Sequence, residues 1–261
     1  MKLAFIGMGN MASALAGGFL RAGKLRRDEI VAFDPNTAGL AAKAAEFGFL
    51  TAKTAADAAR DADAVLIACK PYQVEAALHS LSGVLGGKAL LSIALGWDHA
   101  RYRALLPDDV RVQFIMPNTP ALVGSGVFLF EETNTLLPAE RAALLDLFGA
   151  LGTVMTLPTA QMGIGGAISG CGPAFVDLMI EAYADAAVLY GVSRDTALRL
   201  VSATIEGSAK LQKETGKNPE VLKDMVCSPG GSTIRGVTAL EKAGFRAACI
   251  SSIEAIMKTH N

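Results

Sequence analysis

Two short glycine-rich turns, near opposite ends of the 261-residue chain, contain the residues best suited to bind a charged ligand. The first, "FIGMGNMA", covers residues 5–12, and the second, "SPGGSTI", covers residues 228–234. A helical pattern follows the glycines in each, so the first backbone N–H groups of the helix point outward without intrahelical partners. Such N–H groups hold anions well. The two turns are therefore candidate sites for two anions.

The first turn has the spacing Gly7-x-Gly9-x-x-Ala12, directly after a strand pattern and at the start of a helix pattern. Gly7 permits the tight turn, Gly9 lets a pyrophosphate approach the backbone, and Ala12 keeps the helix close to the strand. An acid, Asp34, ends the second strand pattern roughly twenty residues further on, as in dinucleotide-binding units. We therefore predict that this turn holds the pyrophosphate of a dinucleotide.

Asp34 also bears on which dinucleotide is bound. A carboxylate at this place would accept a hydrogen bond from the ribose 2′-hydroxyl of NAD(H) and would repel the 2′-phosphate of NADP(H). Asn36 and Thr37 follow it and could donate to a phosphate if Asp34 turned away. The residue chemistry alone favours NAD(H).

The second turn has two interpretations, which its own residues leave open. It is either a proline–glycine turn that ends one helix and starts the next, or a binding loop. In the second case, the N–H groups of Gly230, Gly231, Ser232 and Thr233 would bind the carboxylate of a substrate.

The composition excludes several classes of protein. The net charge is −1 and the basic residues are scattered, so a nucleic-acid partner is not expected. No apolar run approaches the ~18 residues that would span a membrane. The four cysteines form no C-x-x-C pair, so we expect reduced thiols in a cytoplasmic protein and no metal site. Residues 1–20 look like a signal peptide, yet the same residues make a strand, a turn and a helix. The three histidines, His79, His99 and His260, are expected at the surface or at helix ends.

Strand and helix patterns alternate along the first part of the chain. Alternation of this kind predicts an α/β fold with a Rossmann-type, mostly parallel sheet and helices on both faces. The last two strand patterns have less helix between them, so we expect one of them to run antiparallel at the edge. The expected helices are Asn10–Ala22, Asn36–Phe47, Thr54–Asp61 and Pro71–Leu81, and the expected strands are 2–7, 29–34, 47–52, 63–70, 89–95, 110–117, 126–132 and 152–157.

The remainder of the chain has only helix patterns. We therefore predict a dinucleotide-binding domain over residues 1–158 and an all-helical domain over residues 159–261. Pro173 suits the first turn of a long helix that ends near Tyr190, and Asn218 with Pro219 suits the start of a short one. The only charges in the long helix, Asp177, Glu181 and Asp185, form one narrow stripe. A helix this apolar must be buried on most of its sides, and a helical domain of about a hundred residues is too small to bury it alone. We therefore predict a homodimer or a larger assembly of dimers.

Several blocks of the sequence closely resemble the pyrroline-5-carboxylate reductase family. They are "AFIGMGNMA", "ACKP", "FIMPNTPALVGSG", "ISGCGPAFVDLMIEAYADAA" and "KDMVCSPGGSTIRGVTALEKAGFRAA", in the same order and spacing. The resemblance implies that the cofactor site consists of Gly7, Gly9, Asn10, Met11 and Ala12 along the pyrophosphate, with Ala68, Cys69, Lys70, Pro71, Met116, Pro117 and Asn118 beside the nicotinamide half. It implies that Ser228, Gly230, Gly231, Ser232 and Thr233 form the substrate loop.

The chain departs from the family pattern at two cysteines. Cys69 replaces a usual valine or small residue, which we expect to be harmless. Cys171 replaces the central serine of the S-G-S-G-P-A pattern, so any role for a hydroxyl there is in doubt.

The resemblance implies the NAD(P)H-dependent reduction of a small cyclic imine, 1-pyrroline-5-carboxylate, to L-proline, the last step of proline biosynthesis. Family members frequently use NADP(H), so we expect NADP(H) as cofactor with NAD(H) as the alternative. Thr233 stands where the family is proposed to bond the ring nitrogen, and it is our candidate catalytic residue.

Two other functions use a similar nucleotide turn. A β-hydroxyacid dehydrogenase would carry a lysine on a helix after a G-x-G-x-x-x-K pattern, and the matching stretch "SGCGPAFVDLM" has none. A dinucleotide-sensing protein without catalysis would leave the second turn unused. Turnover of a cyclic imine would separate both from the reductase.

Overall fold

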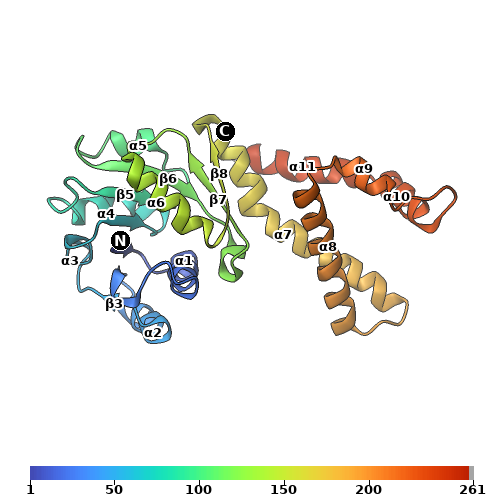
Figure 1. The fold of residues 1–261 in the computed structure, drawn as a ribbon, viewed down its shortest axis with the longest axis horizontal. Helices are drawn as coiled ribbons and strands as arrows, with labels where there is room; N and C mark the ends of the chain where they lie inside the picture. The colour runs from blue at the N-terminus through green and yellow to red at the C-terminus, as the bar shows by residue number, and fades with distance from the viewer. Residues whose placement is uncertain (259–261) are drawn as a thin grey trace. The chain divides into compact units, whose positions relative to one another are not determined.

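The computed structural model describes residues 1–258, which fall into two compact units, Met1–Gly170 and a helical unit from Cys171 onward (Figure 1). The first unit contains one eight-stranded sheet. Its strands are β1 (Leu3–Ile6), β2 (Ile30–Phe33), β3 (Leu50–Thr51), β4 (Ala64–Ile67), β5 (Ala89–Ser92), β6 (Arg111–Met116), β7 (Gly126–Glu131) and β8 (Gly152–Leu157). Its helices are α1 (Asn10–Arg21), α2 (Thr37–Phe47), α3 (Ala55–Arg60), α4 (Val74–Ser80), α5 (His99–Arg103) and α6 (Pro138–Gly149), with short 3₁₀ turns η1 (Arg27–Glu29), η2 (Pro71–Gln73) and η3 (Thr119–Val123).

The strand order is β3-β2-β1-β4-β5-β6-β7-β8, and the strands from β3 to β6 are all parallel. The chain starts in the middle of the sheet, at β1, and crosses over before β4. Carboxyl ends of parallel strands share one edge, and the crevice at this reversal is where doubly wound sheets bind ligands. The predicted fold class and all eight predicted strands are confirmed.

The expectation for the last two strands was wrong in its details. β7 is antiparallel to β6, but β8 is parallel to β7, so both of them run against the other strands. A full helix, α6, connects β7 to β8. Parallel neighbours need such a crossover, whereas the antiparallel pair β6–β7 is joined only through η3.

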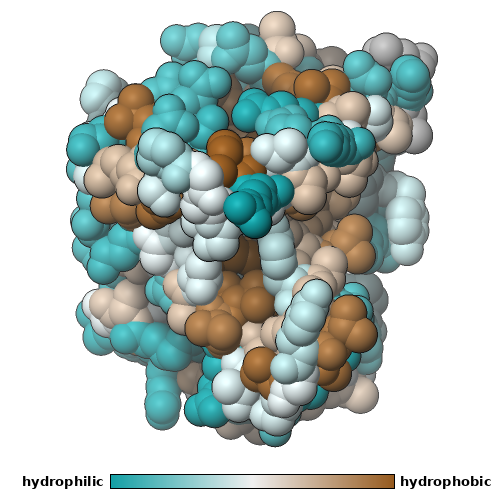
Figure 2. Space-filling view, turned by 90° about the vertical axis from the view of Figure 1, so that its right-hand side faces the viewer, coloured by the Kyte–Doolittle hydropathy of each residue, from teal (hydrophilic) through white to brown (hydrophobic). Residues whose placement is uncertain are grey.

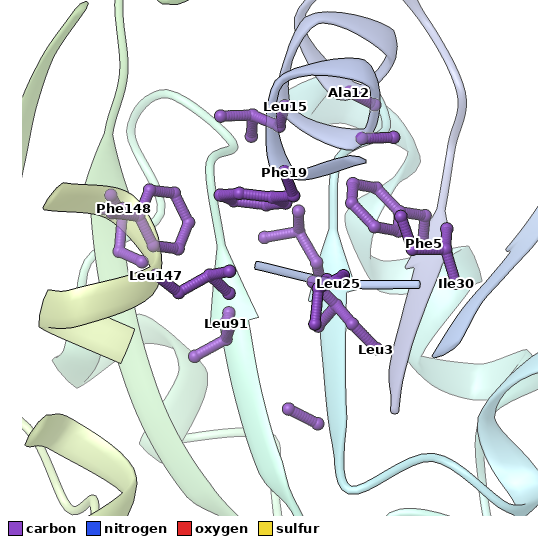
Figure 3. Packing of buried hydrophobic residues seen from close by; sticks show 14 of the residues in the cluster. Leu3, Phe5, Ala12, Leu15, Phe19, Leu25, Ile30, Leu91, Leu147 and Phe148 are labelled. Atoms are coloured by element: carbon purple, nitrogen blue, oxygen red, sulfur yellow. The ribbon is translucent and has the colours of Figure 1, made fainter. Parts of the chain in front are cut away.

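The first unit buries both faces of its sheet. Alternate residues of β1 belong to different cores: Leu3 and Phe5 on one face, Ala4 and Ile6 on the other. Helix α1 covers the first face with Leu15 and Phe19, and Phe19 packs edge-to-face against Phe148 of α6, with ring centroids 5.3 Å apart (Figure 3). This double cover is what a parallel sheet requires.

The long helix α7 (Thr159–Leu189) begins much earlier than predicted. Pro173 lies inside it, not in its first turn. The predicted domain boundary at 158/159 coincides with the start of α7, whereas the boundary of the two compact units lies inside the helix, at Gly170. With its full length, α7 is long and apolar enough to span a membrane, which the apolar runs of the sequence did not predict. Core helices of soluble proteins pass the same test, so this property alone is weak evidence.

The helical unit also contains α8 (Arg194–Thr215), α9 (Pro219–Asp224), α10 (Ser232–Lys242) and α11 (Phe245–Lys258). Asn218 caps α9 as predicted, since its Oδ1 accepts a hydrogen bond from the Glu220 N–H at 2.9 Å. Of residues 171–258, only Ala184 and Ala197 are buried. Leu178, at 65% exposure, and Tyr183, at 45%, represent the many large apolar side chains at its surface. Figure 2 shows such apolar residues, in brown, among polar ones. His260 lies outside the described residues.

Candidate functional site

The first glycine turn joins β1 to α1 and has the geometry that a pyrophosphate site needs. Gly7 has φ +99°, and a Cβ added to it would lie 2.7 Å from the backbone nitrogen of Cys69, so no other residue fits. Gly9 precedes α1 as its N-cap, with an extended backbone and no side-chain hydrogen bond to the helix. A Cβ on Gly9 would meet nothing within 4 Å. The N–H groups that open α1, at Asn10, Met11 and Ala12, have no partner within the helix and no side-chain cap from Gly9, which is the arrangement that binds an anion.

Asp34 lies beside this turn, just after β2, and both of its carboxylate oxygens accept backbone hydrogen bonds. The Met8 N–H donates to Oδ2 at 2.7 Å, and the Asn36 N–H donates to Oδ1 at 2.8 Å. The carboxylate thus fastens the glycine turn to the start of the β2–α2 connection. Asn36 caps α2 through its Oδ1, which accepts from the Gly39 N–H at 3.0 Å. These bonds fix the orientation of the Asp34 carboxylate, and each of its oxygens keeps a further lone pair that could accept from a ribose hydroxyl.

The residues Ala68, Cys69, Lys70 and Pro71 follow β4, the strand beside β1. The Ala68 N–H donates to the Ile6 carbonyl at 2.9 Å, and the Lys70 N–H donates to Gln73 Oε1 at 3.1 Å. Cys69 is half-buried, and burial raises the pKa of its thiol, as does the nearby Asp34 charge to a smaller extent. A neutral thiol is compatible with the close approach of a nicotinamide, so the Cys69 departure from the family pattern introduces no charge.

Met116 ends β6, and Pro117 and Asn118 follow it at the same edge of the sheet. Asn118 is 6% exposed and makes two hydrogen bonds. Its Oδ1 accepts from the Val127 N–H at 2.8 Å, and its Nδ2 donates to the Ser169 carbonyl at 3.0 Å. All the predicted cofactor residues therefore lie at the carboxyl edge of the parallel strands, in one unit.

The second glycine turn opens α10 in the helical unit. Gly230 has φ +69°, and the Gly231 N–H donates to the Ser228 carbonyl at 3.0 Å, which closes the turn. Gly231 is the N-cap of α10 and lacks a side-chain cap, and Ser232 and Thr233 are not buried. The first N–H groups of α10 are therefore open to an anion.

The two turns share one local geometry. The N-cap residues Gly9 (φ −70°, ψ −175°) and Gly231 (φ −68°, ψ 172°) have nearly the same backbone angles. Five other helices are capped by a side-chain oxygen, which occupies one of the same N–H groups, whereas α4 and α6 begin without one. The five capping residues are Asn36, Thr54, Asp98, Ser193 and Asn218. Glycine at the N-cap leaves these groups to a ligand.

Sequence reasoning missed the part that Trp97 plays near the cofactor edge. Trp97 is 2% exposed and belongs to a core, but its indole N–H also donates to the Pro71 carbonyl at 3.0 Å. The Arg101 guanidinium lies 4.0 Å from the centre of its ring. A tryptophan soon after the β5 pattern was the only available signal, because nothing in the sequence indicates which carbonyl it meets.

No group of three or more metal-ligating side chains occurs within residues 1–258. A doubly wound sheet with an open glycine turn at its reversal point, and a second unit of helices, defines the class of dinucleotide-dependent oxidoreductases. Two protein-family models match the chain. The family "Pyrroline-5-carboxylate reductase dimerisation" matches residues 159–261, and the family "NADP oxidoreductase coenzyme F420-dependent" matches residues 2–96.

Relatives identify the family. The pyrroline-5-carboxylate reductase of Treponema pallidum is 38% identical over 99% of this chain and 100% of its own length, and that of Escherichia coli is 38% identical over 98% and 96%. The solved Plasmodium falciparum enzyme, with NADP bound, is 32% identical with a TM-score of 0.88, covering 99% of this chain and 96% of its own. The chain belongs to the pyrroline-5-carboxylate reductase family.

A solved 3-hydroxyisobutyrate dehydrogenase from Mycobacterium tuberculosis, which bears on the dehydrogenase alternative, is 16% identical with a TM-score of 0.53. That likeness concerns the fold alone.

Proposed function

We propose that this protein reduces 1-pyrroline-5-carboxylate to L-proline with NADP(H), and that NAD(H) is an alternative cofactor. The observation that carries the proposal is the pair of helices with glycine N-caps, one in each unit, in a member of this family. The reaction has two anionic reactants, a dinucleotide and an imine carboxylate. Two open helix N-termini correspond to one site for each.

Preference for NADP(H) is supported by the relatives: the Plasmodium falciparum enzyme was solved with NADP bound, and residues 2–96 match an NADP oxidoreductase family. The Asp34 carboxylate, held by the Met8 and Asn36 N–H groups, is the feature that would instead favour NAD(H). Residues Gly7 to Ala12 would hold the pyrophosphate, and Asn36 at the start of α2 would lie on the adenosine side. Ala68 to Pro71 and Met116 to Asn118 would line the nicotinamide half.

When bound, the nicotinamide supplies the hydride. A protonated imine already carries the positive charge that makes its carbon electrophilic, so the chain's own residues mainly bind and orient the reactants. The N–H groups at Gly230, Ser232 and Thr233, with Ser228, would hold the imine carboxylate, whereas the Gly231 N–H is already bonded to the Ser228 carbonyl and serves to close the turn. The Thr233 hydroxyl would bond the ring nitrogen and fix the face of the imine that receives hydride.

We further propose that the chain acts in the cytoplasm as a homodimer or a larger assembly of dimers, with residues 1–158 binding cofactor and residues 159–261 binding substrate and partner. The match of residues 159–261 to the dimerisation family of pyrroline-5-carboxylate reductases supports this division. The exposed apolar side chains of that unit also support it, because surfaces of this kind are usually covered by a partner.

The test is loss of nicotinamide absorbance with purified protein, pyrroline-5-carboxylate, and NADPH or NADH in parallel. We expect loss that depends on the imine and is faster with NADPH. T233A should lower kcat/KM by roughly 5- to 150-fold, which corresponds to about 1–3 kcal/mol for an unmade hydrogen bond.

T238A is the matched control, because Thr238 lies on the same helix but its hydroxyl bonds only the Ile234 carbonyl of that helix, at 2.8 Å. An unchanged kcat/KM for T233A would remove Thr233 from the mechanism. Absence of turnover with both cofactors would reject the reductase itself.

A further inference from the structure

Pro173 creates a local problem inside α7. A proline has no backbone N–H, so the carbonyl four residues earlier loses its helical donor. That carbonyl belongs to Ser169. An unpaired, partly buried carbonyl destabilises the folded state, so the group needs another donor.

Asn118 supplies that donor from a distant part of the chain. Its Nδ2 lies 3.0 Å from the Ser169 carbonyl oxygen, across 51 residues of sequence. The Asn118 side chain is almost fully buried, which fixes its position. Near this bond, Met162 of α7 packs in a small core with Phe114 of β6 and Leu129 of β7. The first turns of α7 therefore pack on the sheet through Met162, and the bond from Asn118 holds the same helix further along, at Ser169.

The other end of the same amide is also used. Asn118 Oδ1 accepts a hydrogen bond from the Val127 N–H at the start of β7, at 2.8 Å. The amide therefore holds three segments together: the turn after β6, the first residues of β7, and α7. Because both ends of the side chain are bonded within the protein, a contribution of Asn118 to cofactor binding falls to its backbone and to the placement of its turn.

We propose that Asn118 is a positioning residue that replaces the helical hydrogen bond lost at Pro173, and that it thereby fixes the Met116–Asn118 turn against α7. The second half of this statement rests on the proposed function, in which the turn lines the nicotinamide half. In that role the side chain acts on hydride transfer through the turn that it holds.

The first test is a double-mutant cycle measured by thermal unfolding, with N118D and P173A. The carboxylate introduced by N118D keeps an acceptor for the Val127 N–H but offers no N–H to the Ser169 carbonyl, and P173A returns an N–H to that carbonyl from within the helix. We expect N118D to lower the Tm by about 3–8 °C. In the P173A background the same substitution should cost about half as much or less, because the carbonyl no longer needs Asn118.

N134D is the matched control. Asn134 likewise donates from Nδ2 to a carbonyl, that of Glu132 at 2.8 Å, and accepts from a backbone N–H, that of Leu136 at 3.2 Å, but it is more exposed and neither of these partners belongs to α7. Its effect on Tm should be the same with and without P173A. N118S is measured beside N118D, because it also withholds the N–H from the Ser169 carbonyl but adds no buried charge, whose cost would be present in both backgrounds. Equal effects of N118S in both backgrounds would overturn the proposal.

The second test separates positioning from stability. N118D should lower kcat for the imine by about 5- to 10-fold while the KM for NADPH changes less than about twofold, since the pyrophosphate turn is intact. P173A should reduce the Tm loss caused by N118D to about half or less but should not restore kcat, because it repairs the helix without reconnecting the turn to it. A kcat within about twofold of wild type for N118D would overturn the positioning role. If the wild-type protein reduces no imine, the proposed function fails, and the Tm cycle still decides whether Asn118 serves the Ser169 carbonyl.

Discussion

The two units of this chain solve the problem of burying apolar side chains in opposite ways. The first unit buries large residues completely on both faces of one sheet, such as Phe19 and Phe148 on one face and Tyr102 on the other. Among residues 171–258 of the second, only two alanines are buried, while side chains such as Leu178 and Tyr183 are exposed. Sequence hydrophobicity alone therefore does not tell whether a core is completed within one chain. A sheet with helices on both faces completes its core, whereas single helices with apolar surfaces need another molecule.

The largest expected effect comes from placing a charge on the exposed apolar surface of the helical unit. Leu178 is 65% exposed in the single chain, so L178E should be harmless if the chain works alone. If a partner covers it, the buried charge should weaken association on the order of a hundredfold or more. Light scattering would give the mass, and imine reduction the activity.

L105E is the control for that experiment. Leu105 has a similar exposure, 52%, but lies in the first unit, after α5. We expect its mass and activity to match the wild type. A dimeric and active L178E protein would remove the contrast between the units.

The next effect compares the same substitution in the two glycine turns. G7A places a Cβ 2.7 Å from the Cys69 nitrogen and 2.9 Å from the Ala68 carbonyl oxygen, and rigid backbone cannot yield. G230A meets nothing within 4 Å and costs only the strain of a positive φ, about 1–2 kcal/mol. Urea unfolding should show the larger loss for G7A. Equal losses would mean that the first turn is no more tightly enclosed than the second.

A smaller effect on stability, but a specific one on binding, is expected at Gly9. The structure has room for a Cβ there and the backbone angles suit alanine, so G9A should unfold within about 2 °C of the wild type. The methyl group would stand where a pyrophosphate approaches, so the Kd for NADPH should rise by about tenfold or more. Calorimetric titration measures the Kd, and an unchanged value would place the pyrophosphate elsewhere.

The smallest effect concerns pH. Burial raises the pKa of the Cys69 thiol, so the unfolded chain loses this proton at a lower pH than the folded one. The associated stability is fully present below about pH 8.5 and is lost as the pH rises through the folded-state pKa. C69A should therefore reduce the fall in Tm between about pH 8 and 10, by a degree or two. C249A, at an exposed thiol of the helical unit, should leave that fall as it is. Identical profiles for the two variants would count against the prediction.

The sequence predicted the sheet well because each strand of the first unit combines β-branched or other apolar residues with flanking turn residues. It predicted the Gly7 turn for the same local reason, since the spacing of glycines and the start of a helix are read along the chain. The start of α7 was wrong because proline usually marks a first turn, and the donor that permits Pro173 inside the helix is Asn118, far earlier in the chain. The roles of Asn118 and Trp97 depend on such distant partners, which a local pattern cannot specify.

Trp97 has one more consequence. It is the only tryptophan of the chain, so the intrinsic fluorescence of the protein on tryptophan excitation comes from one indole ring. That ring donates to the Pro71 carbonyl, beneath the turn proposed to line the nicotinamide half. Reduced nicotinamide absorbs at the wavelengths at which tryptophan emits. The protein thus carries its own optical probe at a cofactor-side turn, and a change in this emission would follow occupancy of the site without any label.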